Sequence, residues 1–175
     1  KATKPHLEAM KKEMCVYRYL RERGIHWAPR VLCMDNPYNP QGFVMTHAGD
    51  QVTSDNLPHD YREQFLRIID EMKAAGVTHN DLKYEAKDLV NISKPTGGRT
   101  WRYKNLEIYV KHGRLGLIDF NMVTINQSWS CRDAYGATMV GHRVPRKSHR
   151  RSSKPGDAFA LEALDKLHER GLSLE

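Results

Sequence analysis

Several features are absent or scarce in this 175-residue sequence, and each absence excludes a class of protein. No apolar run approaches the ~20 residues that cross a membrane, and residues 1–14 lack the apolar core of a secretory signal. Cys15, Cys33 and Cys131 form no CxxC pair, so neither a zinc ribbon nor a disulfide framework is expected. The nine histidines show no paired helical spacing, which argues against a zinc enzyme. These absences predict an intracellular protein, cytoplasmic or nuclear, with no membrane partner.

Basic charge is the most marked property that the sequence does have. The net charge is +7 and the isoelectric point is about 9.4, which favours anionic partners such as a nucleotide, a nucleic acid or an acidic peptide. The densest run of cations spans residues 143–154. It is typical of a solvated segment or of a nucleic-acid contact. Few aromatic residues interleave with these cations, so a stacking surface for single strands is not expected.

The spacing of apolar residues predicts an α+β fold. Apolar residues at steps of three and four predict helices, and alternating or short apolar runs between turn residues predict strands. The expected helices span about residues 5–23, 59–75 and 157–167. The expected strands span 29–34 and 42–46, which form one hairpin, and 105–110 and 115–120, which form a second hairpin around Gly113.

Three acidic motifs follow one another along these elements. Glu13 lies on the first helix, His79-Asn-Asp81-Leu-Lys83 follows the second helix, and Leu117-Ile-Asp119-Phe-Asn121 ends the second hairpin. Phosphoryl transfer requires a carboxylate near the acceptor hydroxyl, metal ions that bridge the phosphates, and a cation that counters the developing charge. The order of these motifs suits that chemistry.

These motifs resemble the protein kinase superfamily, especially its atypical and small-molecule-kinase-like branches, over about residues 8–125. The resemblance implies a protein-kinase-like fold with a partial small lobe and a mainly helical large lobe that carries the catalytic-loop hairpin. The small-lobe remnant would span residues 1–50, the catalytic core 51–135, and a basic segment with a final helix 136–175. Domains of this family are longer than this chain, so the resemblance predicts a fragment or a reduced first lobe.

The resemblance also assigns roles to the two later motifs. Asp81 would orient or deprotonate the acceptor hydroxyl, and Lys83 would lie near the transferred phosphate. A lysine at this place is similar to kinases that act on protein Ser/Thr. Asp119 would hold the Mg²⁺ or Mn²⁺ that accompanies ATP.

A second metal ligand and an insertion follow from the same comparison. The segment between Asp81 and Asp119 is longer than the short catalytic loop of the family, so residues 84–102 are interpreted as an inserted, partly basic loop. Removing them places Asn105 at the position of the second metal ligand. In the rival register, Asp88 takes this position and the insertion moves into the hairpin.

The N-terminal half resembles the family less closely. Glu13 would pair with the lysine that positions ATP, and Met45 and His47 would belong to the hinge against which adenine rests. However, no Gly-rich phosphate loop precedes Glu13, only Lys1 and Lys4 lie upstream of that helix, and Asn121 replaces the usual glycine. These departures leave two alternatives open: a pseudokinase that acts as a binding module, and a basic nucleic-acid-binding protein.

Overall fold

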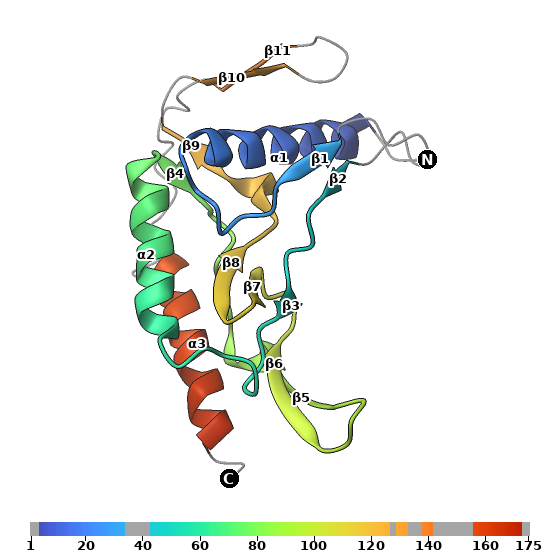
Figure 1. Cartoon of the computed structure of the whole chain (residues 1–175), viewed down its shortest axis with the longest axis vertical. Coiled ribbons are helices and arrows are strands. Elements are labelled where there is room, and N and C mark those ends of the chain that lie inside the picture. The colour runs from blue at the N-terminus through green and yellow to red at the C-terminus, as the bar shows by residue number, and fades with distance from the viewer. Residues whose placement is uncertain (1–3, 34–42, 127–128, 133–137, 142–155, 173–175) are drawn as a thin grey trace.

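The computed structural model describes residues 4–33, 43–126, 129–132, 138–141 and 156–172. In this part of the chain, three helices are combined with several small antiparallel sheets (Figure 1). The predicted α+β class is therefore confirmed, whereas the kinase-like division into two lobes stays a prediction. The basic run at 143–154 lies outside the described residues.

Helix α1 (Lys4–Glu22) lies across one end of the molecule (Figure 1). The expected helix at 5–23 is confirmed. Its inner face buries Val16, Tyr17 and Leu20 in the core. The helix ends where Gly24 adopts a φ of +75°, a left-handed conformation that glycine reaches without steric cost.

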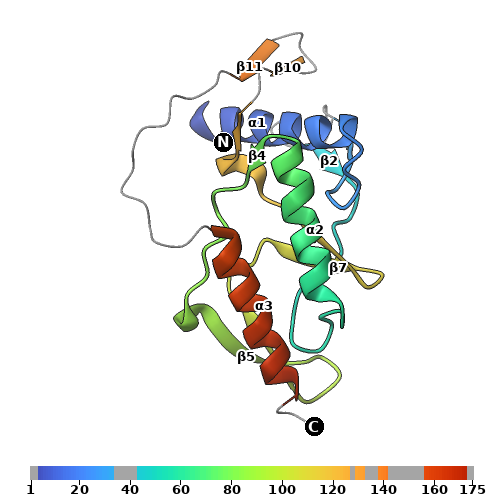
Figure 2. The same cartoon turned by 90° about the vertical axis from the view of Figure 1, so that its left-hand side faces the viewer.

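Helices α2 (Tyr61–Ala74) and α3 (Gly156–Leu172) lie side by side (Figures 1 and 2). Each helix also buries an apolar stripe in the core. Each large apolar side chain buried there contributes about 1.5–3 kcal/mol. The buried residues are Tyr61, Phe65, Ile68, Ile69 and Met72 of α2 with Ala160, Ala163, Leu164 and Leu167 of α3. The Tyr61 hydroxyl also donates to Asp165 at 2.7 Å.

The short strands form four two-stranded pairs and one three-stranded sheet in the described residues. All pairings are antiparallel. The pairs are β1 (Val31–Cys33) with β2 (Val44–Met45), β4 (Val77–Thr78) with β9 (Thr124–Ile125), β5 (Leu89–Ser93) with β6 (Arg99–Tyr103), and β10 (Trp129–Arg132) with β11 (Thr138–Gly141). The larger sheet has the order β3 (Asp50–Gln51), β7 (Ile108–Lys111), β8 (Arg114–Leu117).

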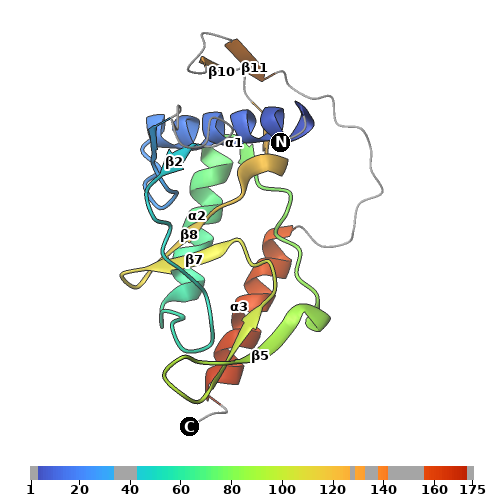
Figure 3. The ribbon, with the colours of Figure 1, turned by 90° about the vertical axis from the view of Figure 1, so that its right-hand side faces the viewer.

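The β7–β8 hairpin lies between α1 and the β5–β6 hairpin (Figure 3). Its turn is His112-Gly113, and both residues have positive φ, which matches the twist of paired strands. The register pairs Ile108 with Leu117, and one step further the Ile118 N–H donates to the Glu107 carbonyl at 3.0 Å. Residues 107 and 119 therefore both lie at the open end of this hairpin.

The structure corrects the expectation of a loop at residues 84–102. This segment contains a 3₁₀ turn, η1 (Ala86–Asp88), and nearly all of the β5–β6 hairpin. The hairpin begins after Asp88 and ends before Lys104, and the Lys104 N–H donates to the Asp88 carbonyl at 2.9 Å. The two ends of the hairpin are thus joined by a backbone hydrogen bond, and whether the segment is an insertion stays a prediction.

The expectation that the cysteines form no disulfide is wrong. Cys15 of α1 and Cys131 of β10 are bonded, although 116 positions separate them in the sequence. Local spacing rules detect cysteines that lie close in sequence, whereas this pair meets only because β10 packs beside α1. A second finding agrees with the sequence: no helix in the described ranges is long and apolar enough to cross a bilayer.

Candidate functional site

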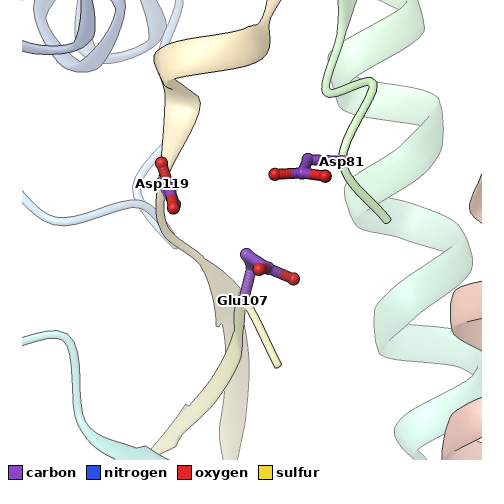
Figure 4. A group of neighbouring side chains, drawn as sticks. All are labelled: Asp81, Glu107 and Asp119. Carbon is purple, nitrogen blue, oxygen red and sulfur yellow. The ribbon is translucent and has the colours of Figure 1, made fainter. Parts of the chain in front are cut away.

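Three carboxylates from separate segments converge at one point (Figure 4). Carboxylate oxygens of Asp81, Glu107 and Asp119 all lie within 4.8 Å of one another. Asp81 comes from the loop after β4, Glu107 from the residue before β7, and Asp119 from the segment after β8. Oxygen ligands from one or two carboxylates are what Mg²⁺ takes in phosphate-handling sites, so the donor set fits such an ion.

Asp81 is held in place by contacts between its loop and the segment after β8. The His79 ring Nε2 lies 2.9 Å from the Ile118 carbonyl. Asn80 adopts a φ of +69°, and its amide donates to the Met122 carbonyl at 3.0 Å and to the Thr124 hydroxyl at 2.7 Å. Because β4 also pairs with β9, the loop that carries Asp81 is attached to the segment that carries Asp119.

Asp119 has a left-handed backbone, with a φ of +62°. Such a conformation costs an L-residue of order 1–3 kcal/mol and persists only where the surroundings enforce it. Here the Asp119 N–H donates to the Tyr17 hydroxyl at 3.2 Å, and the next residue, Phe120, is fully buried. Backbone strain is thus present at the residue for which the kinase resemblance predicts metal binding.

An aromatic stack connects the three motifs. The Phe120 ring lies 5.2 Å from the Tyr17 ring in an edge-on arrangement and 4.9 Å from the His79 ring. Burial lowers the pKa of His79, which favours a neutral, structural imidazole. The stack fixes α1, the Asp81 loop and the Asp119 segment relative to one another.

Glu13 lies at the α1 end of this stack. The Tyr17 hydroxyl donates to its carboxylate at 3.1 Å, and the Phe120 backbone N–H also donates to it. Burial raises the pKa of Glu13, and the charge of Asp119 adds to the effect. The structure therefore brings Glu13 close to Asp119 and makes it a brace between α1 and the start of η2 (Phe120–Met122).

Glu107 is a member of the cluster that the sequence reasoning missed. The Tyr84 hydroxyl makes a short hydrogen bond to its carboxylate, and the Glu107 N–H donates back to that hydroxyl at 3.3 Å. Burial raises the pKa of Glu107, and the charges of Asp81 and Asp119 raise it further. A usable signal existed: Glu107 is acidic between apolar Leu106 and Ile108 at the start of the hairpin whose other strand leads to Asp119.

An open cavity of about 540 Å³ adjoins the cluster. Its lining includes Asn105, Glu107 and Asp119, so the predicted second ligand shares a cavity with the predicted first one. Asn105 lies in a turn with a φ of +51°. The rival, Asp88, is elsewhere: its carboxylate accepts the Glu85 N–H at 3.2 Å and closes the η1 turn.

The predicted hinge residues, Met45 and His47, do not line this cavity. Met45 lies in β2, paired with Val31. His47 is exposed, its carbonyl accepts from the Lys111 ammonium at 3.1 Å, and it lines a different cavity of about 830 Å³ beside α2. Lys83 is exposed two residues after Asp81 and is not among the residues that line the cavity of Asp119.

The arrangement can bind a divalent cation together with an anion that the cation neutralises, because acidic and basic side chains line one cavity. Asp81 is the exposed member of the cluster and is the carboxylate best placed to meet a second molecule. Function must be inferred from this chemistry alone. Comparison of the chain with protein-family models, with curated proteins and with solved structures finds no match in any of the three.

Proposed function

We propose that this chain is a protein-kinase-like phosphotransferase that uses ATP with Mg²⁺ or Mn²⁺. One observation carries the proposal: Asp81 and Asp119, selected from the sequence as the base and the metal ligand, meet within 4.8 Å together with Glu107. Carboxylates this close repel one another, and a bound divalent cation would offset that repulsion. Their convergence beside a cavity is what a metal–phosphate site requires.

Each residue has a distinct role in this proposal. Asp119 and Glu107 would hold the divalent cation, and Asn105 would add a neutral oxygen from the same cavity. When bound, the cation would counter the negative charge of the phosphate. Asp81 accepts the proton of the acceptor hydroxyl, and Lys83, on the same exposed loop, attracts the transferred phosphate.

Protein Ser/Thr is the proposed acceptor. This choice depends on Lys83 in the HNDLK motif, which is similar to protein kinases of that specificity. Because Asp81 and Lys83 are both exposed, the loop is open to a side chain presented by another protein. A small-molecule acceptor would reach the same loop and is distinguished by direct assay.

The decisive experiment compares Asp81→Asn with Asp88→Asn. Phosphate transfer from labelled ATP to a mixture of Ser/Thr peptides is measured with Mg²⁺, and ATP affinity is measured by calorimetry. We expect Asp81→Asn to abolish transfer with ATP affinity within about threefold of the parent. Asp88→Asn keeps a side-chain oxygen that can accept the Glu85 N–H and lies away from the acidic cluster, so turnover should persist. Transfer that survives Asp81→Asn, or is lost only in Asp88→Asn, would refute the assignment.

A specific observation favours a second candidate, a pseudokinase that binds nucleotide without catalysis. The Glu13 carboxylate is used by Tyr17 and Phe120 as a structural brace, and no Gly-rich loop precedes it in the sequence. Thermal stability with ATP, with and without Mg²⁺, separates this candidate from the enzyme when it is combined with the transfer assay. Stabilisation of about 2.7 kcal/mol at a hundredfold excess over Kd, without turnover, would favour the binding module.

A further inference from the structure

Two cations from the inserted hairpin face the same cavity as the acidic cluster. Arg102, in β6, and Lys104, directly after it, line the cavity together with Asn105, Glu107 and Asp119. The lining therefore contains both carboxylates and two cationic side chains. A cavity that contained only a metal ion would gain nothing from the two cations, because they repel it.

Not all hydrogen-bond donors of the Arg102 guanidinium have a partner in the described residues. Its Nη1 donates to the Gln51 side-chain oxygen at 2.9 Å, which is a neutral partner. Its Nε is buried and has no hydrogen-bond partner among the described residues. An unpaired buried donor costs about 1–3 kcal/mol, and more when the group is charged. The negative charge of an anion in the cavity would attract the Arg102 guanidinium and offset part of that cost.

The guanidinium is held by a rigid framework. Gln51 is itself fixed, because its amide donates to the Tyr103 carbonyl at 3.2 Å. The Trp101 carbonyl accepts the Ser54 N–H at 2.9 Å, and the Trp101 N–H donates to the Ser54 hydroxyl at 3.1 Å. The Arg170 guanidinium of α3 lies over the Trp101 ring at 4.8 Å. Contacts on both sides of β6 thus fix the position of Arg102 before any ligand binds.

Lys104 complements this site from the end of the hairpin. It is exposed, and its backbone is fixed by the hydrogen bond to the Asp88 carbonyl. No ion pair within the described residues occupies its ammonium. Lysine acts on phosphate as a mobile point charge, whereas arginine offers a planar fork of donors. Together they provide one fixed and one adaptable cation.

We infer that Arg102 and Lys104 form a phosphate-binding subsite, in which the inserted hairpin holds the anion while the carboxylates hold its metal ion. This inference rests on the proposed function and adds to it the groups that bind the phosphate. The phosphate belongs either to the nucleotide or to a phosphorylated acceptor. Both sources present the same chemistry, and binding measurements distinguish them.

The experiment uses Arg102→Gln and Lys104→Gln in the full chain. Affinities for ATP, AMP, adenosine and inorganic phosphate are measured by calorimetry with Mg²⁺ at fixed ionic strength. The matched control is Lys87→Gln, because Lys87 lies on the same insertion but is exposed and pairs with Glu85 at 2.7 Å. Arg102→Lys keeps the charge without the fork and serves as the second variant if Arg102→Gln does not fold.

We expect Arg102→Gln to weaken ATP binding about tenfold or more, with adenosine affinity unchanged and Lys87→Gln equal to the parent. Weakened binding of inorganic phosphate with unchanged ATP affinity would assign the subsite to a phosphorylated acceptor. The inference is overturned if neither anion loses affinity in Arg102→Gln, or if adenosine loses as much as ATP. These are equilibrium measurements, so a failure of turnover in the Asp81→Asn comparison would leave them interpretable.

Discussion

Glu107→Gln is the most informative single change, because it should have opposite effects on the metal-free protein and on the response to metal. The variant removes one of three charges whose oxygens lie within 4.8 Å of each other. Glutamine keeps a side-chain oxygen that can accept the Tyr84 hydroxyl. The packing and the hydrogen bond are therefore largely preserved while the charge is lost.

The size of the effect follows from Coulomb's law. Two unit charges 4.8 Å apart repel by about 1 kcal/mol in water and by about 3.5 kcal/mol at an effective dielectric constant of about 20. Asp81 is exposed and the other two carboxylates are half-buried, so the lower value applies after screening. Because Glu107→Gln removes two such repulsions, with Asp81 and with Asp119, we expect the metal-free variant to gain about 2 kcal/mol, which raises the Tm by about 4–8 °C for a chain of this size.

The pH dependence of the Tm of the metal-free protein provides a second test of the charge on Glu107. Because the folded-state pKa of Glu107 is raised above its ordinary value of 4.5, its contribution to stability is fully present below pH 4.5. That contribution is lost as the pH rises through the raised pKa. The Tm of the metal-free parent should therefore fall across this window. Glu107→Gln should flatten that part of the profile.

Differential scanning calorimetry in EDTA and across a Mg²⁺ titration provides the measurement. In the parent, Mg²⁺ at a hundredfold excess over its Kd should add about 2.7 kcal/mol, and in Glu107→Gln the apparent metal affinity should fall about tenfold or more. Two results together would refute the reasoning: a lower Tm of the variant in EDTA, and an unchanged response to Mg²⁺. They would show that Glu107 stabilises the fold and holds no cation.

Two further predictions concern the fold that supports the site. Reduction of the Cys15–Cys131 disulfide, or its replacement by two serines, should lower the free energy of unfolding by up to about 5 kcal/mol, because the bond closes a loop of more than a hundred residues. Denaturant unfolding with and without reductant measures this loss. An identical unfolding midpoint under both conditions would contradict the prediction. Gly116→Ala should destabilise the β7–β8 hairpin by about 1–3 kcal/mol, because the added methyl carbon would lie 2.4 Å from the Trp27 carbonyl oxygen. Gly156→Ala, whose added carbon would lie 3.8 Å from its nearest neighbour, the Leu82 carbonyl oxygen, is the control and should be nearly neutral; equal loss in both variants would argue against the close contact as the cause.

The sequence predicted the elements of the fold well wherever a local pattern determines them. The expected helices at 5–23 and 59–75 are α1 and α2. Both predicted hairpins are present. In each case the spacing of apolar residues is itself the physical cause, because it decides which face is removed from water.

Features that depend on tertiary packing could not be predicted in the same way. Cys15 and Cys131 meet because β10 packs beside α1, and no spacing rule encodes that contact. Glu107 looked like the polar position of an alternating strand, which is usually a solvated one. Only the register of the β7–β8 hairpin and the contacts of the Asp81 loop turn it toward two other carboxylates.

The geometry also explains why a long insertion is compatible with the acidic cluster. Asp81 and Asp119 are brought together by the β4–β9 pairing and by the Asn80 and His79 contacts, none of which involves the chain between Asp88 and Lys104. The length of that chain is therefore free to vary without separating the carboxylates. Because the hairpin rejoins the core beside Asn105, the residues at its end face the same cavity. Changes in this hairpin would therefore alter the cavity lining at Arg102 and Lys104 while the contacts that place the carboxylates stay the same.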